Sequence, residues 1–93
     1  GHSFIAPNSF SPNGDGLNDM WLPAIIGSTE YQLKIYNRWG QLIFESKDKN
    51  EPWDGSHLGG EHYVPNGTYQ YRVILKDFGK IPYEYEGFIN LIR

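Results

Sequence analysis

The strongest candidates for chemistry lie near the start of the chain, in the stretch FSPNGDGLND at residues 10–19. Asn13, Asp15 and Asp19, with the carbonyl of Leu17 between them, place oxygen atoms at alternating positions, and short calcium loops surround an ion in this way. An EF-hand would need a glutamate at its twelfth position, and counted from Asn13 that position is Ala24. With only two carboxylates, the pattern predicts a weak calcium site.

The same residues also suit a rigid loop without a metal. Asn and Asp side chains bond backbone N–H groups two residues on, and glycine adopts positive φ readily. No helix is predicted after Gly14 and Gly16, so the stretch lacks the helix N-terminus that a phosphate loop needs. We interpret it as a structural entry loop, with calcium as a secondary aid to its rigidity. The loop comprises Pro12, Asn13, Gly14, Asp15, Gly16, Asn18 and Asp19.

The remaining polar residues make a poor case for catalysis. His57 and His62 stand five apart in a glycine-rich stretch, which matches neither helix-borne metal-ligand spacing nor an evident catalytic dyad. No serine has the context of a nucleophile elbow. We therefore predict that the protein is not an enzyme and requires no cofactor.

Composition excludes several partners. Eleven acidic against eight basic residues leave a net charge of -3, whereas nucleic-acid binding needs a dense basic surface. No apolar run approaches the roughly 20 residues of a membrane span, so direct membrane insertion is not predicted. The 93 residues suit one domain, and without cysteine its thin core must rest on the aromatic residues, which make up 16% of the chain.

Strand signals recur along the chain, and helix signals are nearly absent. YQLKIYN (31–37) alternates Tyr31, Leu33 and Ile35 with polar or amphipathic neighbours, which is the period of a half-buried strand. The fold predicted is all-β: a small immunoglobulin-like antiparallel β-sandwich of about six or seven strands. Its expected strands cover residues 3–6, 20–23, 31–37, 41–46, 68–76 and 83–93.

The connections carry turn chemistry. NRWG places Asn37 and Gly40 at the first and fourth positions of a predicted type I turn. DFGK closes a second hairpin, in which Gly79 can take a positive φ. Residues 46–66 are expected to form the only long loop, anchored by Trp53 and Tyr63.

Cations and tryptophans offer two candidate binding surfaces, each with an alternative. Lys34 and Arg38 share one strand face, and Arg72 and Lys76 share another, so they form either a docking stripe for an acidic partner or cross-strand pairs to Glu45 or Glu84. The tryptophans form either a sugar-stacking platform or core, with one pointing outward from its turn. These tryptophans are Trp21, Trp39 and Trp53, of which Trp39 lies in the turn.

Five motifs resemble, in order, one known family. They are PNSFSPNGDGLNDMW, LKIYNRWGQLIFES, WDG, PNGTYQYRV and GFINLIR. The chain looks like the gliding-motility-associated C-terminal domain, the type B sorting domain of the type 9 secretion system in Bacteroidota, over residues 5–93. The family's marks fall on the entry loop, on Tyr36 to Gly40, and on Gly87 and Arg93.

The resemblance implies a sorting signal. Such a domain directs a passenger, cell-surface adhesins among them, through the periplasm and across the outer membrane to the cell surface or medium. It implies a translocon-associated partner, expected to be an outer-membrane protein of the PorP/SprF-like kind. The residues predicted to bind that partner are Asn37, Arg38, Trp39, Gly40, Lys34, Arg72, Ile92 and Arg93.

The two ends of the chain carry further expectations. Residues 1–3 resemble a cloning remnant, so residues 4–93 are taken as a single C-terminal sorting domain with a passenger upstream. The last strand pattern runs to Ile92 and Arg93, which predicts unpaired backbone groups open to strand addition by a receptor. The alternative function is an adhesin or carbohydrate-binding module that uses Trp39 and Trp53.

Overall fold

The computed structural model describes residues 1–93 and contains seven strands and no helix. No segment of it forms a helix long and apolar enough to cross a membrane. The strands are β1 (Ser3–Ile5), β2 (Ser9–Phe10), β3 (Ala24–Ile26), β4 (Ser28–Tyr36), β5 (Leu42–Ser46), β6 (Gly67–Asp77) and β7 (Pro82–Leu91).

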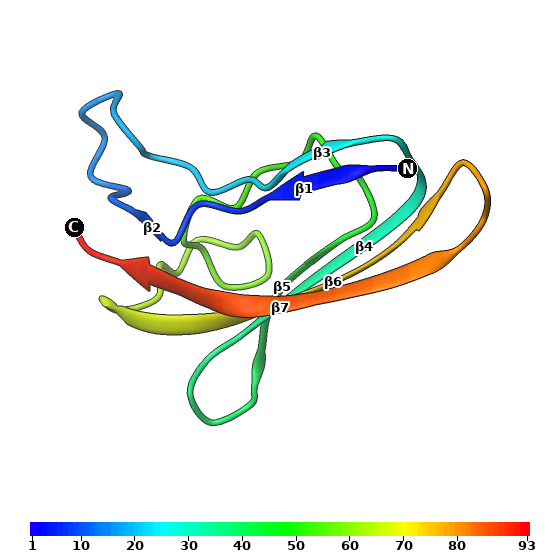
Figure 1. Cartoon of the computed structure of the whole chain (residues 1–93). Helices are drawn as coiled ribbons and strands as arrows, with labels where there is room; N and C mark the ends of the chain where they lie inside the picture. The colour runs from blue at the N-terminus through cyan, green and yellow to red at the C-terminus, as the bar shows by residue number, and fades with distance from the viewer.

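The strands form two layers of unequal size. β1 and β3 pair antiparallel as a two-stranded sheet, with Phe4 opposite Ile25. The other sheet has the order β2-β7-β6-β4-β5 and is antiparallel except for the two-residue parallel pair of β2 and β7. Figure 1 shows the smaller sheet lying over the larger one. The prediction of an all-β sandwich with about seven strands is confirmed.

Strand alternation produces the core. Along β6 the buried apolar side chains are those of Tyr69, Tyr71, Val73 and Leu75, and the residues between them face outward. Burying one such side chain fully stabilises the fold by about 1.5–3 kcal/mol. Because the chain has no disulfide, this apolar layer and its aromatic contacts hold the two sheets together.

Two buried tryptophans organise the long connections. The expected strand at residues 20–23 is wrong: only Trp21 pairs there, in an isolated bridge with Trp53. Residues 11–23 are therefore a second long connection, beside the one at residues 46–66 that the sequence predicted. Trp53 does anchor the latter, being 0% exposed, whereas Tyr63 is 61% exposed and provides no buried anchor.

The two hairpin turns differ from each other. The Asn37–Gly40 turn has the predicted form, since the Gly40 N–H donates to the Asn37 carbonyl at 3.0 Å and Gly40 has a φ of 80°. In the β6–β7 turn, Lys80 takes the positive φ (60°), and the expectation for Gly79 is wrong. The buried Asp77 side chain fixes this turn by accepting the Ile81 N–H at 3.0 Å.

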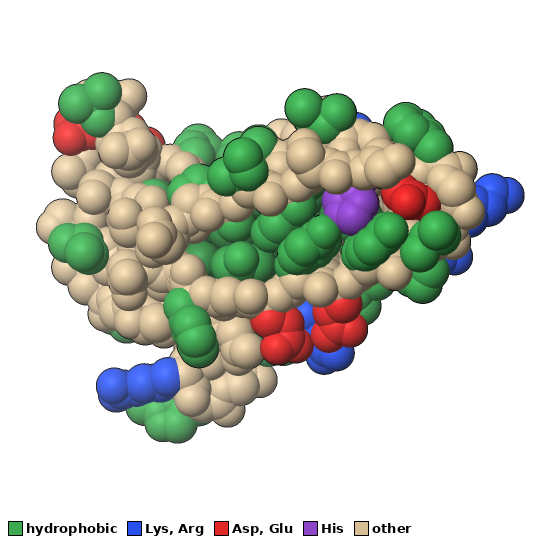
Figure 2. Space-filling model, viewed as in Figure 1, with side chains coloured by type: hydrophobic (Ala, Val, Ile, Leu, Met, Phe, Trp, Pro, Cys, Tyr) green, Lys and Arg blue, Asp and Glu red, His purple; other side chains and the backbone are tan.

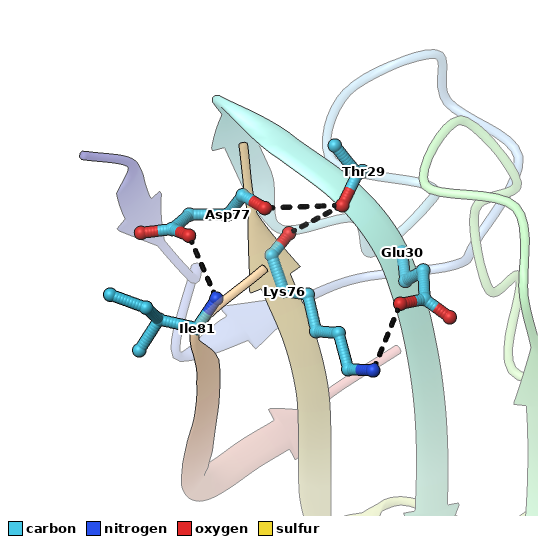
Figure 3. A network of polar contacts seen from close by, with 5 residues as sticks. All are labelled: Thr29, Glu30, Lys76, Asp77 and Ile81. Atoms are coloured by element: carbon cyan, nitrogen blue, oxygen red, sulfur yellow. Dashed lines mark hydrogen bonds and ion pairs between the residues drawn. The ribbon is translucent and has the colours of Figure 1, made fainter. Parts of the chain in front are cut away.

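The start of β4 is fastened to the same turn (Figure 3). Its register against β6 shifts between Ser28 and Glu30, and the Thr29 hydroxyl donates to the Asp77 carbonyl at 3.2 Å. Beside it, Lys76 and Glu30 form an ion pair of 3.2 Å on the outer face. β4 therefore begins three residues earlier than the alternation from Tyr31 suggested.

Gly87 is required by the side chain opposite it. It pairs with Tyr71 across β6 and β7, and a Cβ at this position would lie 2.5 Å from the Tyr71 hydroxyl and 2.6 Å from its ring. The tyrosine ring therefore lies across the glycine, where no larger residue fits.

We expect Gly87→Ala to lower the free energy of unfolding by on the order of 1–3 kcal/mol, because an extra methyl overpacks this contact. Chemical denaturation of both proteins measures the change. Gly79→Ala is the comparison: its new Cβ would meet Asp77 Oδ1 at 3.3 Å, a tight contact that a shift of a few tenths of an ångström relieves, so it should cost less than Gly87→Ala. An alanine at Gly87 as stable as the parent would contradict the contact.

Tyr31 carries the one buried side-chain polar atom without a hydrogen-bond partner. Its ring lies on the inner face of β4 and is 7% exposed. Burial raises the pKa of the Tyr31 hydroxyl above its ordinary value of 10.0, and the nearby Asp48 and Glu51 charges raise it further. Burial raises the pKa values of Tyr69 and Tyr71 as well.

These shifts predict a loss of stability in alkali. The unfolded chain releases the Tyr31 proton near pH 10, whereas the folded chain keeps it to higher pH. The free energy of unfolding therefore holds its full Tyr31 contribution below pH 10 and loses it as the pH rises above that value. Tyr31→Phe should leave stability at pH 7 unchanged or slightly higher, and should flatten the alkaline loss without abolishing it. Unfolding curves at pH 7 and above pH 10 measure this, with Tyr63→Phe as the exposed control; parallel losses in Tyr31→Phe and the parent would contradict it.

Candidate recognition surfaces

The entry loop is stiffened by its own side chains. Asp19 accepts two backbone N–H groups, from Gly14 at 3.0 Å and from Gly16 at 2.7 Å. Asn13 Oδ1 accepts the N–H of Asp15, and Asp15 Oδ1 accepts that of Leu17. The loop therefore consists of turns in which the Asn and Asp side chains bond the backbone, as interpreted from the sequence.

Three residues of the loop take the left-handed backbone conformation. Gly14 has a φ of 81°, Gly16 of 83° and Asn18 of 53°. Glycine and asparagine adopt this region most readily, which explains why the tight path has these residue types. The Ser11 N–H donates to the Asn18 carbonyl at 2.7 Å and closes the loop at its base.

The oxygens proposed as calcium ligands are thus engaged with the backbone. Both carboxylate oxygens of Asp19 and one of Asp15 accept N–H groups. The chain contains no group of three or more His, Cys, Asp or Glu arranged to hold a metal ion. Calcium at Asn13, Asp15 and Asp19 stays a prediction, which the melting experiment below addresses.

The structure joins the entry loop to the last residue of the chain. One hollow of about 420 Å³ is lined by residues of both, together with residues of the 46–66 connection. Arg93 lies at its edge, where Nη1 donates to the Val64 carbonyl at 2.6 Å. Gly55 has a φ of 88°, and a Cβ there would lie 3.3 Å from Arg93 Nη2. The lining residues are Pro12, Gly14, Asp19, Met20, Asp54, Tyr63 and Arg93.

The predicted open strand at Ile92 and Arg93 is not present. The Ile92 N–H donates to the Phe10 carbonyl at 3.1 Å, and the Arg93 N–H donates to Asn66 Oδ1 at 3.2 Å. β2 lies beside the end of β7 and supplies the partner that the sequence pattern could not reveal. Binding of a partner to the Ile92 and Arg93 side chains stays a prediction. The Ile92 side chain is accessible to such a partner, since it is 58% exposed.

The Asn37–Gly40 turn presents an aromatic and cationic pair. Trp39 is 71% exposed, and the Arg38 guanidinium lies 4.2 Å from the centre of the indole ring. Asn37 stiffens the turn, because its Oδ1 accepts the N–H groups of Trp39 and Gln41. Figure 1 shows this turn projecting below the larger sheet, whereas the entry loop rises above it near the C-terminus, so the predicted residues form two separate surfaces.

The four-cation stripe is wrong, and the cross-strand alternative is confirmed. Lys34 lies opposite Arg72 as expected, but Arg38 follows the end of β4 and belongs to the turn. Arg72 contacts Glu84 at 2.6 Å and Glu86 at 3.5 Å, while Lys34 lies 3.8 Å from Glu45. The hydrogen bond to Glu84, and then its charge, raise the pKa of the Arg72 guanidinium.

Two of the three tryptophans of the predicted sugar-stacking platform are buried and cannot contact a sugar. Trp21 and Trp53 are both 0% exposed, and each indole N–H donates to a backbone carbonyl, of Pro7 and of Ser56. Trp39 alone points outward, as its place in the turn predicted. The three tryptophans therefore do not form a common platform.

Sequence reasoning missed the residues that connect the motifs. Asp54 and Tyr63 line the hollow with Arg93, and the guanidinium lies 5.9 Å from the Tyr63 ring centre. The WDG and PNG motifs were the available signal, because they flank the residues that receive Arg93. Nothing in the spacing of the chain indicated that the C-terminal arginine would meet them.

The comparison with known families gives one match. The model of the family described as CHU_C Type IX secretion signal domain matches residues 4–91. This range runs from β1 to the last residue of β7 and includes both the entry loop and the Asn37–Gly40 turn. No curated protein matches the chain.

The entry loop yields a stability test. Asp19→Ala removes the acceptor of two backbone bonds and should lower the free energy of unfolding by about 1 kcal/mol, whereas Asp15→Ala removes one bond and should cost less. Thermal melts of the parent in excess calcium and in chelator test the metal prediction in the same series. A bound ion requires a higher Tm with calcium, and equal values would contradict the calcium site.

Proposed function

Because the chain belongs to the CHU_C type IX secretion signal domain family, we propose that it is a folded sorting label which directs an attached passenger through the type IX secretion system. As a domain of this family it interacts with the secretion machinery and serves export to the cell surface or the medium. The single observation that carries this conclusion is the family match over residues 4–91.

The recognition step fits the rigid surfaces of the domain. A label shared by different passengers must be recognised without reference to them, so its contact residues need fixed geometry before binding. The Asn37–Gly40 turn and the entry loop meet this need, since side-chain bonds to the backbone hold both. Preorganised groups lose less conformational entropy on binding.

The exposed pair in the hairpin turn is the proposed contact for the partner. Tryptophan and arginine are enriched in the residues that dominate interface energetics, and Arg38 and Trp39 stand together at 4.2 Å on a projecting turn. We assign the partner to an outer-membrane protein of the PorP/SprF-like kind, reached from the periplasm. Lys34 and Arg72 are secondary contacts, because their charges are already paired within the sheet.

The passenger is proposed to be a surface protein, with adhesins of gliding Bacteroidota as the expected class. In this proposal the domain acts by binding and needs no catalytic group or required cofactor. The entry loop lies between β2 and β3 and lines one hollow together with Arg93.

A binding module for carbohydrate is the second candidate, favoured by one observation. Trp39 is 71% exposed, and because the Arg38 guanidinium covers one face of its ring, a sugar would stack on the other face. Titration with polysaccharides, followed by tryptophan fluorescence, distinguishes the candidates because the other two indoles are buried. A saturable shift that Trp39→Ala abolishes would favour this function over the sorting label.

We expect a fluorescent passenger fused ahead of residues 4–93 to leave a gliding bacterium only when both the domain and the translocon are intact. Arg38→Ala/Trp39→Ala should reduce export while leaving the Tm within a few degrees, because the two side chains lie outside the core. The controls are a translocon-null strain and Lys49→Ala, another exposed cation. Reporter that stays in the periplasm in every strain would contradict the sorting function.

A further inference from the structure

The larger sheet has an open edge along most of β7. On one side β7 pairs with β6 over its whole length, but on the other side β2 covers only Asn90 and Leu91. The N–H groups of Asn90 and Ile92 donate to this covering segment, to the carbonyls of Asn8 and Phe10. Backbone groups alternate sides along a strand, so Glu84, Glu86 and Phe88 also direct theirs away from β6. No backbone bond within the domain reaches them.

An apolar recess lies directly inside this edge, between β7 and β1. β1 faces β7 across the two layers without any backbone pairing, and aromatic side chains line the space between them. Phe4 stacks on Tyr85 with ring centres 4.2 Å apart, and both side chains are only partly buried. Figure 2 shows apolar side chains open to view in a recess between two strips of backbone. We call this feature the β1–β7 seam.

The seam already accepts a side chain at one end. His2 lies against Tyr83, with ring centres 4.2 Å apart, and hydrogen-bonds to the Tyr85 hydroxyl. Its backbone makes no bond to β7. This end of the recess is therefore filled by the residue just before β1, and the stretch beside Phe4 and Tyr85 is the part that faces the open edge.

The charges beside the seam indicate which kind of strand could pair with this edge. On the outer face of β7, Glu84 and Glu86 share one cation, Arg72, so one negative charge remains beside the edge. Two copies of β7 paired antiparallel across this stretch would bring glutamates next to glutamates, which is destabilising. A strand with lysine or arginine at its outward positions would instead gain cross-strand pairs.

From these observations we propose that the β1–β7 seam is a strand-addition site for an extended segment of a secretion-machinery protein, in which apolar residues alternate with basic ones. The backbone of the segment pairs with Glu84, Glu86 and Phe88. Its apolar side chains enter the recess against Phe4 and Tyr85, and its basic side chains lie beside the two glutamates. The identity of the partner rests on the proposed sorting function, whereas the strand-addition site itself does not.

A proline substitution can block pairing at this edge without lowering the stability of the domain. Glu86→Pro removes an N–H that points away from β6, and proline is tolerated at such edge positions. Glu45→Pro is the matched control on the opposite edge. The alternation that runs through β6 and β4 directs the Glu45 N–H away from β4 as well, and no backbone bond uses it. Both variants remove one exposed glutamate that pairs with a cation.

In the export assay, we expect Glu86→Pro to abolish release of the passenger and Glu45→Pro to leave it unchanged, with similar Tm values for the two domains. Normal export of Glu86→Pro beside normal export of the parent would overturn the strand-addition site and leave the sorting function standing. Failure of the parent itself to be exported would instead contradict the sorting function.

Binding to the isolated domain supplies a test that does not depend on export. The probes are two synthetic peptides of about six residues, the usual strand length, with valine alternating with lysine or with glutamate. Amide hydrogen exchange at Glu84, Glu86 and Phe88 should slow by about tenfold with the lysine peptide only. The double variant Glu84→Lys/Glu86→Lys should reverse the preference. Equal protection by both peptides, protection by neither, or slow exchange at these amides in the free domain would overturn the proposal.

Discussion

The backbone bridge between Trp21 and Trp53 is the contact on which the rest of the structure depends. Each residue donates its N–H to the carbonyl of the other, at 2.8 and 2.9 Å, and neither side chain is exposed. Trp21 belongs to the connection between β2 and β3, and Trp53 to the one between β5 and β6. In a small domain without disulfides, this pairing turns two long polar connections into part of the core.

The same bridge decides where the recognition surfaces stand. By drawing residues 11–23 onto the 46–66 connection, it places the entry loop beside Asp54 and Tyr63, where Arg93 can reach both. The Asn37–Gly40 turn takes no part in this packing; it joins the end of β4 to the start of β5 and projects below the larger sheet. The domain therefore presents two rigid surfaces from a single core, and each is held by side-chain bonds to backbone N–H groups rather than by burial.

Because the two sheets differ in size, some strand edges of the larger sheet stay unpaired. A two-stranded layer cannot cover a five-stranded one, and any sheet that does not close leaves edges. β2 and the connection at residue 58 pair with portions of the two outer strands, and glutamates stand on both. The stretch from Glu84 to Phe88 retains unpaired backbone next to partly exposed aromatic rings, a combination that a sheet normally avoids unless a partner supplies the missing strand.

Alternation of side chains and turn-forming residues are local properties of the sequence. They were enough to determine the all-β class, the strands β4 to β7, the Asn37–Gly40 turn and the entry loop whose side chains bond its own backbone. Its ordered motifs also pointed to the family. Tertiary structure decided what depends on contacts between distant residues: that Trp21 and Trp53 are a bridge, that β2 covers Ile92, and that Arg38 leaves the row of cations. It also decided which edge of β7 stays open, because pairing depends on which segments the core brings alongside, and no local pattern encodes that choice.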